Sequence, residues 1–341
     1  MKKRLLFLTL FAFFLGRTHL FAQEASPTHM LNFYWDDDYL NLQGKGTDRA
    51  YTSGQRIDYF YMKQHPSGFF LDRMMPKAGS QHTDIYSWSL MQVMVTPDNI
   101  SDPSFQPNDY PWSGALFVAH SLYSYNGERK FAFKTEALLG VMGPASLAGS
   151  TQRLVHRLIN YREPEGWSNQ FGNTPLVNAA FSAEKQEWSW NNFLEVIGGA
   201  RIDAGSLLDE LTVYQYVRIG IMNPYFDGLS MLKPASGQRR RRTEFYLFMK
   251  PQAEAVAYDA LLQGSIFSSR PTFSDPSPLD SKAAGTPDRY HAINHLLVEE
   301  DYGCALSVGA ISITYTQKPT TAYMKGLYKH NVGNITICKS W

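Results

Sequence analysis

Apolar and polar residues alternate with a period of two along much of this chain. Such alternation places one set of side chains on each face of an extended strand. Between residues 130 and 141, Phe133 and Leu139 fall on one face, while Lys134 and Glu136 fall on the other. Charges on the second face suit a wet lumen better than a dry core. The pattern therefore predicts strands of a transmembrane β-barrel, apolar outside and polar inside.

The same alternation recurs over residues 211–221 and at the end of the chain, where Ile335, Ile337 and Trp341 share one face. A terminal aromatic residue on the outward face is common in outer-membrane barrels. Further strands are expected at residues 29–38, 50–62, 84–95, 112–125, 175–184, 187–202, 243–258, 290–299 and 304–317. We therefore predict a single all-β domain over residues 23–341, an antiparallel barrel of about twelve strands.

The N-terminus has the pattern of an export signal. A basic start precedes an apolar run from Leu5 to Leu15, and the small residue Ala22 follows. These features predict a cleaved signal peptide over residues 1–22, because the run is shorter than the roughly 20 apolar residues of a membrane-spanning helix. Together with the strands, they predict a multi-pass barrel in the outer membrane of a Gram-negative cell.

Charge and cysteine content narrow the picture further. The net charge of +1 implies neither nucleic acid nor a bulk anionic surface as a partner, and no partner protein is suggested. The basic run from Arg239 to Arg242 is interpreted as a solvated turn, and the long polar connection 259–289 is expected outside the cell. Cys304 and Cys338 do not make a disulfide framework, although export would permit one bridge.

One segment departs from the strand rhythm. Residues 150–160 predict a helix of about three turns, with Ser150 as its N-cap. Gln152 and His156 lie four residues apart on one face. A neighbouring apolar stripe is formed by Thr151, Val155 and Leu158. If both termini are periplasmic, this loop after the fifth strand is extracellular, and loops often carry function.

Two groups of residues near the N-terminus could carry chemistry. The acids Asp36, Asp37 and Asp38 end the first strand, where carboxylate oxygens suit a hard cation such as Ca²⁺, although plain solvation also explains them. Thr52 and Ser53 open the second strand and would lie beside these acids in a hairpin. Hydroxyl groups at a strand start are usually structural, so neither group establishes a site by itself.

Gln152 and His156 make a third group. A histidine can take a proton from water near neutral pH, and a glutamine amide can hold that water or a substrate oxygen. A histidine that is merely hydrogen-bonded is the structural alternative. The chain has no Gly-x-Ser-x-Gly elbow and no His-Glu-x-x-His zinc motif. Water is therefore a better candidate for the nucleophile than a serine.

Taken together, these segments resemble the outer-membrane lipid A 3′-O-deacylase (LpxR) family from Asp36 to Trp341. The likeness is carried by Asp36-Asp37 with Asp48 to Gly54, by Gln92 with Thr96-Pro97, and by a block from Gly140 to Gln170 that includes Gly143-Pro144, Thr151-Gln152, Val155-His156 and Gly166-Trp167. The resemblance implies a twelve-stranded barrel with its site at the outer leaflet, between the wall and a loop helix. It also implies a Ca²⁺-dependent enzyme that removes the 3′-linked acyloxyacyl group from lipid A of lipopolysaccharide.

Residue by residue, the resemblance gives His156 the role of general base, Gln152 that of its helical partner and Thr52 that of the site threonine. It assigns Asp36 and Asp37 to the metal, which would stabilise the oxyanion. Asp36 departs from the family, because an asparagine is expected there. The change keeps an oxygen ligand, adds negative charge and removes an NH₂ donor.

A second departure follows Thr96-Pro97, where some members have a Lys-Arg pair and this chain has Asp98-Asn99. Contacts to a lipid phosphate would then come from other residues, with Arg153 and Arg157 as candidates. The acid that the family has just after the helix is Glu163 or Glu165. Two other functions remain open: a catalytically silent barrel, either a pore or a structural protein, and a hydrolase of another lipid ester such as a phospholipid.

Overall fold

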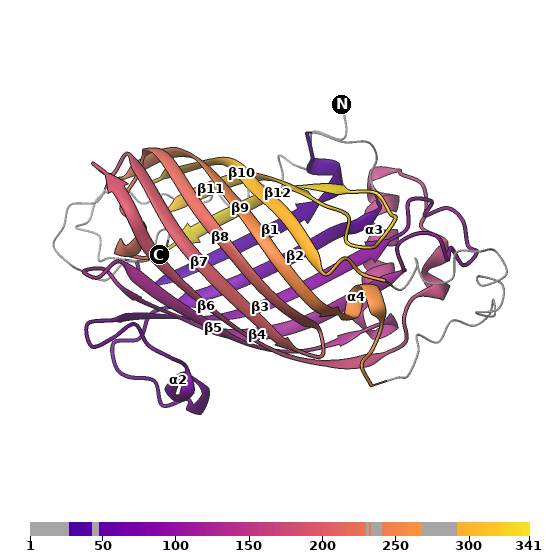
Figure 1. The fold of residues 1–341 in the computed structure, drawn as a ribbon, viewed down its shortest axis with the longest axis horizontal. Coiled ribbons are helices and arrows are strands. Elements are labelled where there is room, and N and C mark those ends of the chain that lie inside the picture. The colour runs from indigo at the N-terminus through magenta and orange to yellow at the C-terminus, as the bar shows by residue number, and fades with distance from the viewer. Residues whose placement is uncertain (1–26, 43–47, 230–231, 233–240, 268–291) are drawn as a thin grey trace.

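The computed structural model describes residues 27–42, 48–229, 232, 241–267 and 292–341. Twelve strands form one closed antiparallel barrel in which β12 returns to pair with β1 (Figure 1). The strands are β1 His29–Asp37, β2 Ala50–Tyr61, β3 Thr83–Thr96, β4 Ser113–Asn126, β5 Phe131–Met142, β6 Thr174–Trp190, β7 Leu194–Gly205, β8 Leu208–Ile221, β9 Thr243–Asp259, β10 Leu296–Val308, β11 Ile311–Thr320 and β12 His330–Ser340. The predicted fold class is confirmed.

Short helices occupy the connections. They are α2 Phe70–Met74, α3 Ala148–Ile159 and α4 Ala260–Gln263, with 3-10 turns η1 Asp38–Leu40, η2 Pro144–Ser146, η3 Gly166–Asn169 and η4 Tyr225–Asp227. No helix within the described ranges has the length and apolar character to cross a bilayer. The signal peptide, Arg239 and Arg240 of the basic run, and most of the connection 259–289 fall outside the described residues.

Two predicted strand boundaries are wrong. β6 continues to Trp190, where a new strand was expected from residue 187, because the turn is made by Asn191 and Asn192. Both have positive φ, which asparagine tolerates better than most residues. Similarly, β10 runs through residues 300–303, where a break between two strands was expected, and the turn into β11 comes at Gly309, whose φ is 59°. In both cases the residue that accepts a left-handed backbone sets the turn.

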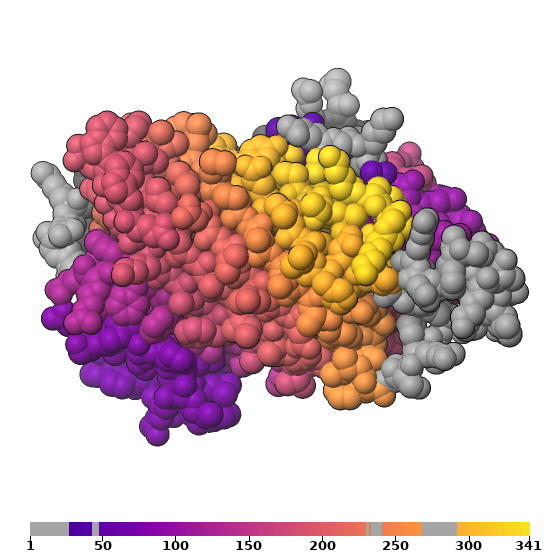
Figure 2. Space-filling model, in the orientation of Figure 1, coloured from indigo at the N-terminus to yellow at the C-terminus, as the bar shows by residue number. Residues whose placement is uncertain are grey.

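Outward and inward side chains alternate as the sequence predicts. Leu139 is 66% exposed on the outer face of β5, whereas Glu136 faces inward and is 6% exposed. Figure 2 shows neighbouring strands packed into a continuous wall on the visible face. Trp341 stacks on His29 and Tyr59, with ring centroids 6.1 and 6.4 Å away. The barrel thus carries an apolar outer surface with an aromatic cluster at the end where its termini meet.

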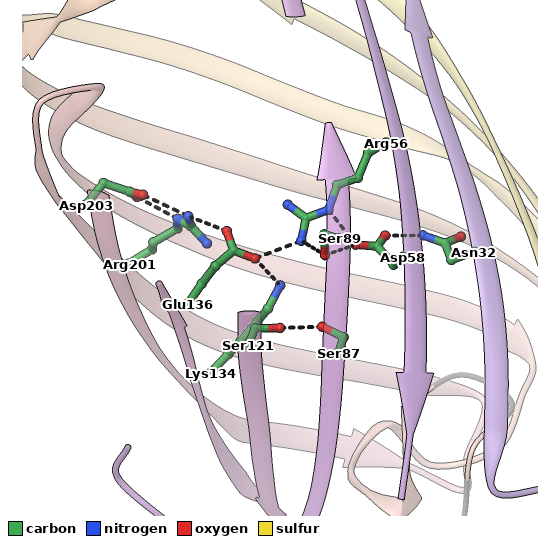
Figure 3. Close-up of polar contacts among 10 residues, drawn as sticks. All are labelled: Asn32, Arg56, Asp58, Ser87, Ser89, Ser121, Lys134, Glu136, Arg201 and Asp203. Carbon is green, nitrogen blue, oxygen red and sulfur yellow. Dashed lines mark hydrogen bonds and ion pairs between the residues drawn. The ribbon is translucent and has the colours of Figure 1, made fainter. Parts of the chain in front are cut away.

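The lumen is crossed by a network of ion pairs (Figure 3). Arg56 on β2 lies 2.6 Å from Asp58 and 2.7 Å from Glu136. On the other side of Glu136, Arg201 lies 3.9 Å away and pairs with Asp203 at 2.6 Å. These groups line a cavity of about 660 Å³. The charged face predicted from the sequence therefore does point into the barrel, where opposite charges neutralise one another.

Apolar clusters close the lumen at both ends. Phe226 and Leu232, in the connection after β8, are fully buried among inward side chains of β1, β3, β4, β5, β7 and β12. At the other end, Leu262 of α4 packs with Tyr110 and Met324 from two other connections. Cys304 and Cys338 are free thiols on β10 and β12. Within the described residues, the central cavity therefore lies between two apolar clusters, one toward each end of the barrel.

The helices divide between the two ends. α3 and α4 lie at one end, and α2 lies at the other, with the C-terminus (Figure 1). β1 begins opposite the end of β12, with Met30 paired to Ser340. The loop after β5 therefore lies at the end of the barrel opposite to the start of β1 and the end of β12, as strand parity predicted.

Candidate active site

Helix α3 lies on the outer surface of the wall. Trp88 and Leu90 on β3 are 44% and 48% exposed, so Met94, on the same face of that strand, also points outward. Met94 is nevertheless buried, because it packs in a cluster with Ala148 of α3 and Trp167 of η3. The loop that follows β5 thus covers the outer face of the wall beside Met94.

Close packing between this loop and the wall depends on small residues. Gly143 has a φ of 97°, and a Cβ there would lie 2.6 Å from backbone atoms of Gly172. A Cβ on Gly149 would lie 2.8 Å from the ring of Trp167. Gln92 of β3 completes the attachment by donating to the carbonyl of Ser146 at 2.6 Å. Two of the sequence blocks that carry the family resemblance therefore meet here.

The start of the helix differs from the prediction. α3 begins at Ala148, and its N-cap is Leu147 in a left-handed conformation without a side-chain cap. Ser150 instead lies inside the first turn and is exposed. η2 reverses the chain before α3, and the Thr151 N–H already bonds to the Leu147 carbonyl at 2.9 Å. The turn geometry therefore starts the helix earlier than the capping pattern suggested.

The apolar stripe of α3 faces away from the protein, whereas the apolar stripe of a surface helix in a soluble protein faces the core. Val155 and Leu158 are 41% and 65% exposed, whereas Gln152 and His156 are each 4% exposed. The helix turns its polar pair toward the wall and its apolar flank away from the protein. On the outside of a barrel, an apolar flank is suited to lipid and need not pack against a core.

Both ring nitrogens of His156 have partners. Nδ1 lies 2.6 Å from the carbonyl oxygen of Arg162, and Nε2 lies 3.1 Å from Oδ1 of Asp48. A carbonyl oxygen only accepts, so Nδ1 carries a proton. Nε2 is therefore the nitrogen that can exchange a proton with a reacting group, once it has released the one shared with Asp48.

Gln152 connects the pair to the rest of the loop. Its Nε2 donates to the same oxygen of Asp48 at 3.0 Å, and its Oε1 accepts from the indole N–H of Trp167 at 2.7 Å. The amide oxygen and one N–H group are thus engaged by the protein. This arrangement orients Asp48 beside His156 and favours a positioning role for Gln152.

Asp48 is the residue that sequence reasoning missed. The segment Asp48 to Gly54 drew attention for its hydroxyl groups, although the acid that opens it was the available signal. Asp48 has a φ of 62° and Ala50 a φ of 53°, both in the left-handed region. Asp38 holds this turn, because its Oδ2 accepts the Arg49 N–H at 3.0 Å. Strained backbone of this kind is found most often at functional sites.

The electrostatics of His156 follow from these contacts. Burial opposes a charge on the ring, but the hydrogen bonds to Asp48 and to the Arg162 carbonyl, together with the charges of Asp48 and Asp37, outweigh it. The pKa of His156 is raised above its usual value. The ring therefore holds its second proton more firmly than a free histidine, and Asp48 is the main favourable partner.

The predicted metal ligands point to opposite faces of β1. Asp36 faces the lumen, where its carboxylate accepts from the Tyr34 hydroxyl at 2.6 Å and lies 3.7 Å from Lys318. Asp37 faces outward and accepts the Tyr39 N–H at 2.9 Å. Adjacent residues of a strand cannot share one face, so the structure does not bring the two carboxylates together. The expected pairing of Asp36 with Asp37 is not formed.

Thr52 lies near these acids, on a bulge of β2. Its hydroxyl is buried and bonds to that of Thr96 at 2.7 Å. No contact between Thr52 and His156 is found among the described hydrogen bonds. The threonine therefore ties β2 to the Thr96-Pro97 motif in this structure.

The basic and acidic residues at the end of α3 are more exposed. Arg157 is paired with Glu163 at 2.7 Å, with side chains 64% and 48% exposed. Glu165 is exposed, and its backbone N–H donates to the Ile100 carbonyl at 2.8 Å. Neither glutamate contacts His156, whose Nδ1 partner is a backbone carbonyl. Arg153 is half-buried on the same flank.

The departure after Thr96-Pro97 also has a place in the structure. Asp98 lies 3.2 Å from Arg49, and the Arg49 guanidinium stacks over the Tyr328 ring at 4.4 Å. The acid thus neutralises an arginine of the loop before β2. No group of three or more His, Cys, Asp or Glu side chains in the described ranges is arranged as a ready metal site.

Comparison with known proteins identifies one family by sequence and one of its members by structure. The sequence model of a family described as "Outer membrane protein LpxR" matches residues 6–341. The solved structure of LpxR from Salmonella typhimurium superimposes with a TM-score of 0.69 at 15% identity, covering 92% of this chain and 100% of that chain. No curated protein sequence matches.

Two autotransporter structures are more distant. The β domain of Bordetella BrkA has a TM-score of 0.44 at 8% identity, covering 93% of this chain and 99% of that chain. The translocator domain of NalP from Neisseria meningitidis has a TM-score of 0.35 at 10% identity, covering 100% of this chain and 95% of that chain.

Proposed function

Because this chain belongs to the LpxR family of outer-membrane lipid A deacylases, we propose that it hydrolyses the 3′-O-linked acyloxyacyl ester of lipid A in the outer leaflet. The observation that carries the proposal is the buried contact of His156 and Gln152 with the same oxygen of Asp48, on the side of α3 that faces the outer wall. A lipid substrate stays in the membrane, so a site on the lipid-facing surface can be reached by lateral diffusion.

His156 acts as the general base in this proposal. Nδ1 donates to the Arg162 carbonyl, so Nε2, which lies 3.1 Å from Asp48, is the nitrogen that takes a proton from water after releasing the one it shares with that carboxylate. The water oxygen then bonds to the ester carbonyl carbon, and the ester C–O bond breaks. The proton on Nε2 passes to the leaving alkoxide, so the products are a free carboxylic acid and a sugar hydroxyl.

Asp48 and Gln152 act through His156. The carboxylate of Asp48 stabilises the imidazolium that forms when Nε2 is protonated. Gln152 holds that carboxylate in place from the preceding turn of α3. Thr52 is a third candidate, and its hydroxyl bond to Thr96 supports a role in fixing the strand end rather than in proton transfer.

The acids on the outer face support a hard cation as cofactor. Burial, and then the charges of Asp37 and Asp48, raise the pKa of Asp38 well above its usual value, so these carboxyl groups lie close enough to repel one another, and a cation would relieve that repulsion. Asp37 would hold Ca²⁺, with water and backbone oxygens completing the set, whereas Asp36 faces Lys318 in the lumen and does not fit. A bound Ca²⁺ would supply positive charge to stabilise the oxyanion.

The flanks of α3 support an amphiphilic substrate. Leu154, Val155 and Leu158 form its exposed apolar flank. Arg153 and Arg157 are four residues apart, so they share the other flank of the helix. We propose that the acyl chains lie along the apolar flank and that the two arginines contact phosphate groups of the lipid A head.

Of the two other functions, the pore has least support. Buried apolar residues, such as Phe226 at one end, occupy both ends of the lumen, and ion pairs cross the cavity between them. A hydrolase of another lipid ester would use the same residues, and the substrate must be distinguished by experiment.

The test is to express the chain in a strain with lipid A of known structure and to measure the lipid A by mass spectrometry. A mass loss of one acyloxyacyl unit is expected, and it should disappear with His156→Ala and with a Ca²⁺ chelator. His65→Ala, which changes an exposed histidine remote from α3, is the matched control and should keep activity. Unchanged lipid A with hydrolysed phospholipid would replace the proposed substrate, and no ester hydrolysis by a folded barrel would overturn the proposal.

A further inference from the structure

The connection between β2 and β3 has no role in the proposed site, and its helix α2 lies outside the strands, at the end of the barrel opposite to α3 (Figure 1). We propose that this segment, residues 62–82, is a second membrane-binding surface, which inserts apolar side chains into the inner leaflet and binds anionic phospholipid headgroups. It does not depend on the enzymatic function.

The segment is fastened to the outer face of the wall. Val118 on β4 is 45% exposed, so His120, two residues further, also points outward. Asp72 of α2 is 1% exposed and accepts from His120 Nε2 at 2.6 Å. The ring of Phe69 packs edge-on against His120, with centroids 5.2 Å apart. The buried pair therefore holds α2 beside the barrel instead of leaving it in the periplasm.

Three large apolar side chains of this segment remain exposed. Phe69, Phe70 and Met74 are 36%, 62% and 76% exposed. Phe69 also contacts Trp88 of the lipid-facing surface, with centroids 6.4 Å apart. The apolar surface of the segment is thus continuous with the outer surface of the barrel. An exposed apolar patch of this kind marks contact with lipid or with a partner, and the continuity selects lipid.

Charge indicates which lipid. Residues 62–82 contain three basic residues, Lys63, Arg73 and Lys77, and one acidic residue, so the net charge of the segment is +2 (3 − 1) with histidine neutral. Lys63 lies 3.3 Å from the buried Asp72, and Lys77 pairs with Asp84 of β3, so Arg73 is the exposed basic residue of the segment that pairs with no acid of the described ranges. Aromatic and basic residues together are typical of membrane interfaces, where cations meet lipid phosphates. The partner is therefore an anionic phospholipid of the periplasmic leaflet.

The first experiment measures where Met74 lies. A nitroxide is attached to Met74→Cys, in a chain with Cys304→Ser and Cys338→Ser, and the barrel is placed in phosphatidylethanolamine–phosphatidylglycerol vesicles. We expect the label to collide more often with oxygen than with a water-soluble nickel chelate. Leu42→Cys is the matched control, because Leu42 is 75% exposed and Met74 is 76% exposed, and they lie in the β1–β2 and β2–β3 connections, at opposite ends of β2. A Met74 label as accessible to nickel as the Leu42 label would overturn the insertion.

The second experiment tests the headgroup. Arg73→Glu in the same labelled chain should increase nickel accessibility at Met74 in phosphatidylglycerol-containing vesicles and leave it unchanged in pure phosphatidylcholine. An equal change in both lipids would overturn the anionic partner. Folding of each variant is checked by the shift in gel migration on heating. Lipid A deacylation by the unlabelled chain should be retained, so failure of this proposal is distinguishable from failure of the proposed function.

Discussion

The charged residues inside the barrel and those beneath α3 are arranged in opposite ways. In the lumen, Arg56 lies between Asp58 and Glu136, so that each acid has a basic partner within 2.7 Å. On the outer wall, Asp37, Asp38 and Asp48 lie together, and among the described residues only His156 forms an ion pair with any of them. The acids of the lumen network have basic partners in the same network, whereas the outer cluster has more acids than basic partners.

The two regions also differ in backbone conformation. The lumen groups stand on regular strands, but Asp48 and Ala50 have positive φ. Unfavourable conformation and uncompensated charge persist only where surrounding structure imposes them, and they concentrate at functional sites. The lumen network therefore serves stability, whereas the cluster beneath α3 is the region suited to bind a group from outside the chain. Changing one residue in each region tests this difference.

The largest effect is expected for His156→Ala. Loss of a general base lowers the rate by about 10²- to 10⁴-fold, while the barrel stays folded because the residue lies outside the wall. The rate of lipid A deacylation in mixed micelles gives the measurement, and the shift in gel migration on heating gives the folding control. A variant with more than half of the original activity would exclude His156 as the base.

Glu136→Ala should have the reverse pattern. Removing this acid takes one partner from Arg56 and one from Arg201, which keep Asp58 and Asp203, and loss of a buried partner costs about 1–3 kcal/mol. The unfolding midpoint in denaturant, measured in micelles, should fall, and the deacylation rate of the folded protein should be unchanged. A comparable loss of activity with unaltered stability would contradict the assignment of the lumen network to stability.

Asp48→Asn should lower activity by about 10- to 100-fold, in line with other residues that orient a catalytic group. Because His156 must be neutral to act as a base, activity rises with pH as the ring loses its proton. Asp48 contributes to the raised pKa of His156, so removing its charge should move the acidic limb of kcat/KM to lower pH. A loss of rate with an unmoved limb would mean that Asp48 acts on folding alone.

The smallest effect is expected for Glu163→Gln. Both members of its pair with Arg157 are largely exposed, and exposed ion pairs contribute little. The deacylation rate should change by less than about twofold. Glu165→Gln, tested in parallel, is expected to behave alike, since neither side chain contacts His156. A large loss for one of them would identify it as the acid that the family has after the helix.

Much of the architecture could be predicted from the sequence. Period-two alternation led to twelve strands and to the separation of Leu139 from Glu136, because each strand residue has only two faces available. Strand parity placed the α3 loop opposite the barrel termini. The same alternation, applied to Asp36 and Asp37, separates them onto opposite faces, and the expectation that they share a metal overlooked it.

The tertiary structure alone decided the partners of His156. Asp48 lies 108 residues away in sequence, and no local pattern relates a turn before β2 to a helix after β5. The same holds for α3, whose spacing revealed an apolar side and a polar side but not which one meets protein. Closure of the barrel decided the partners of His156 and the orientation of α3, because it placed the helix outside the wall. There the apolar flank faces lipid, and Gln152 and His156 face the wall.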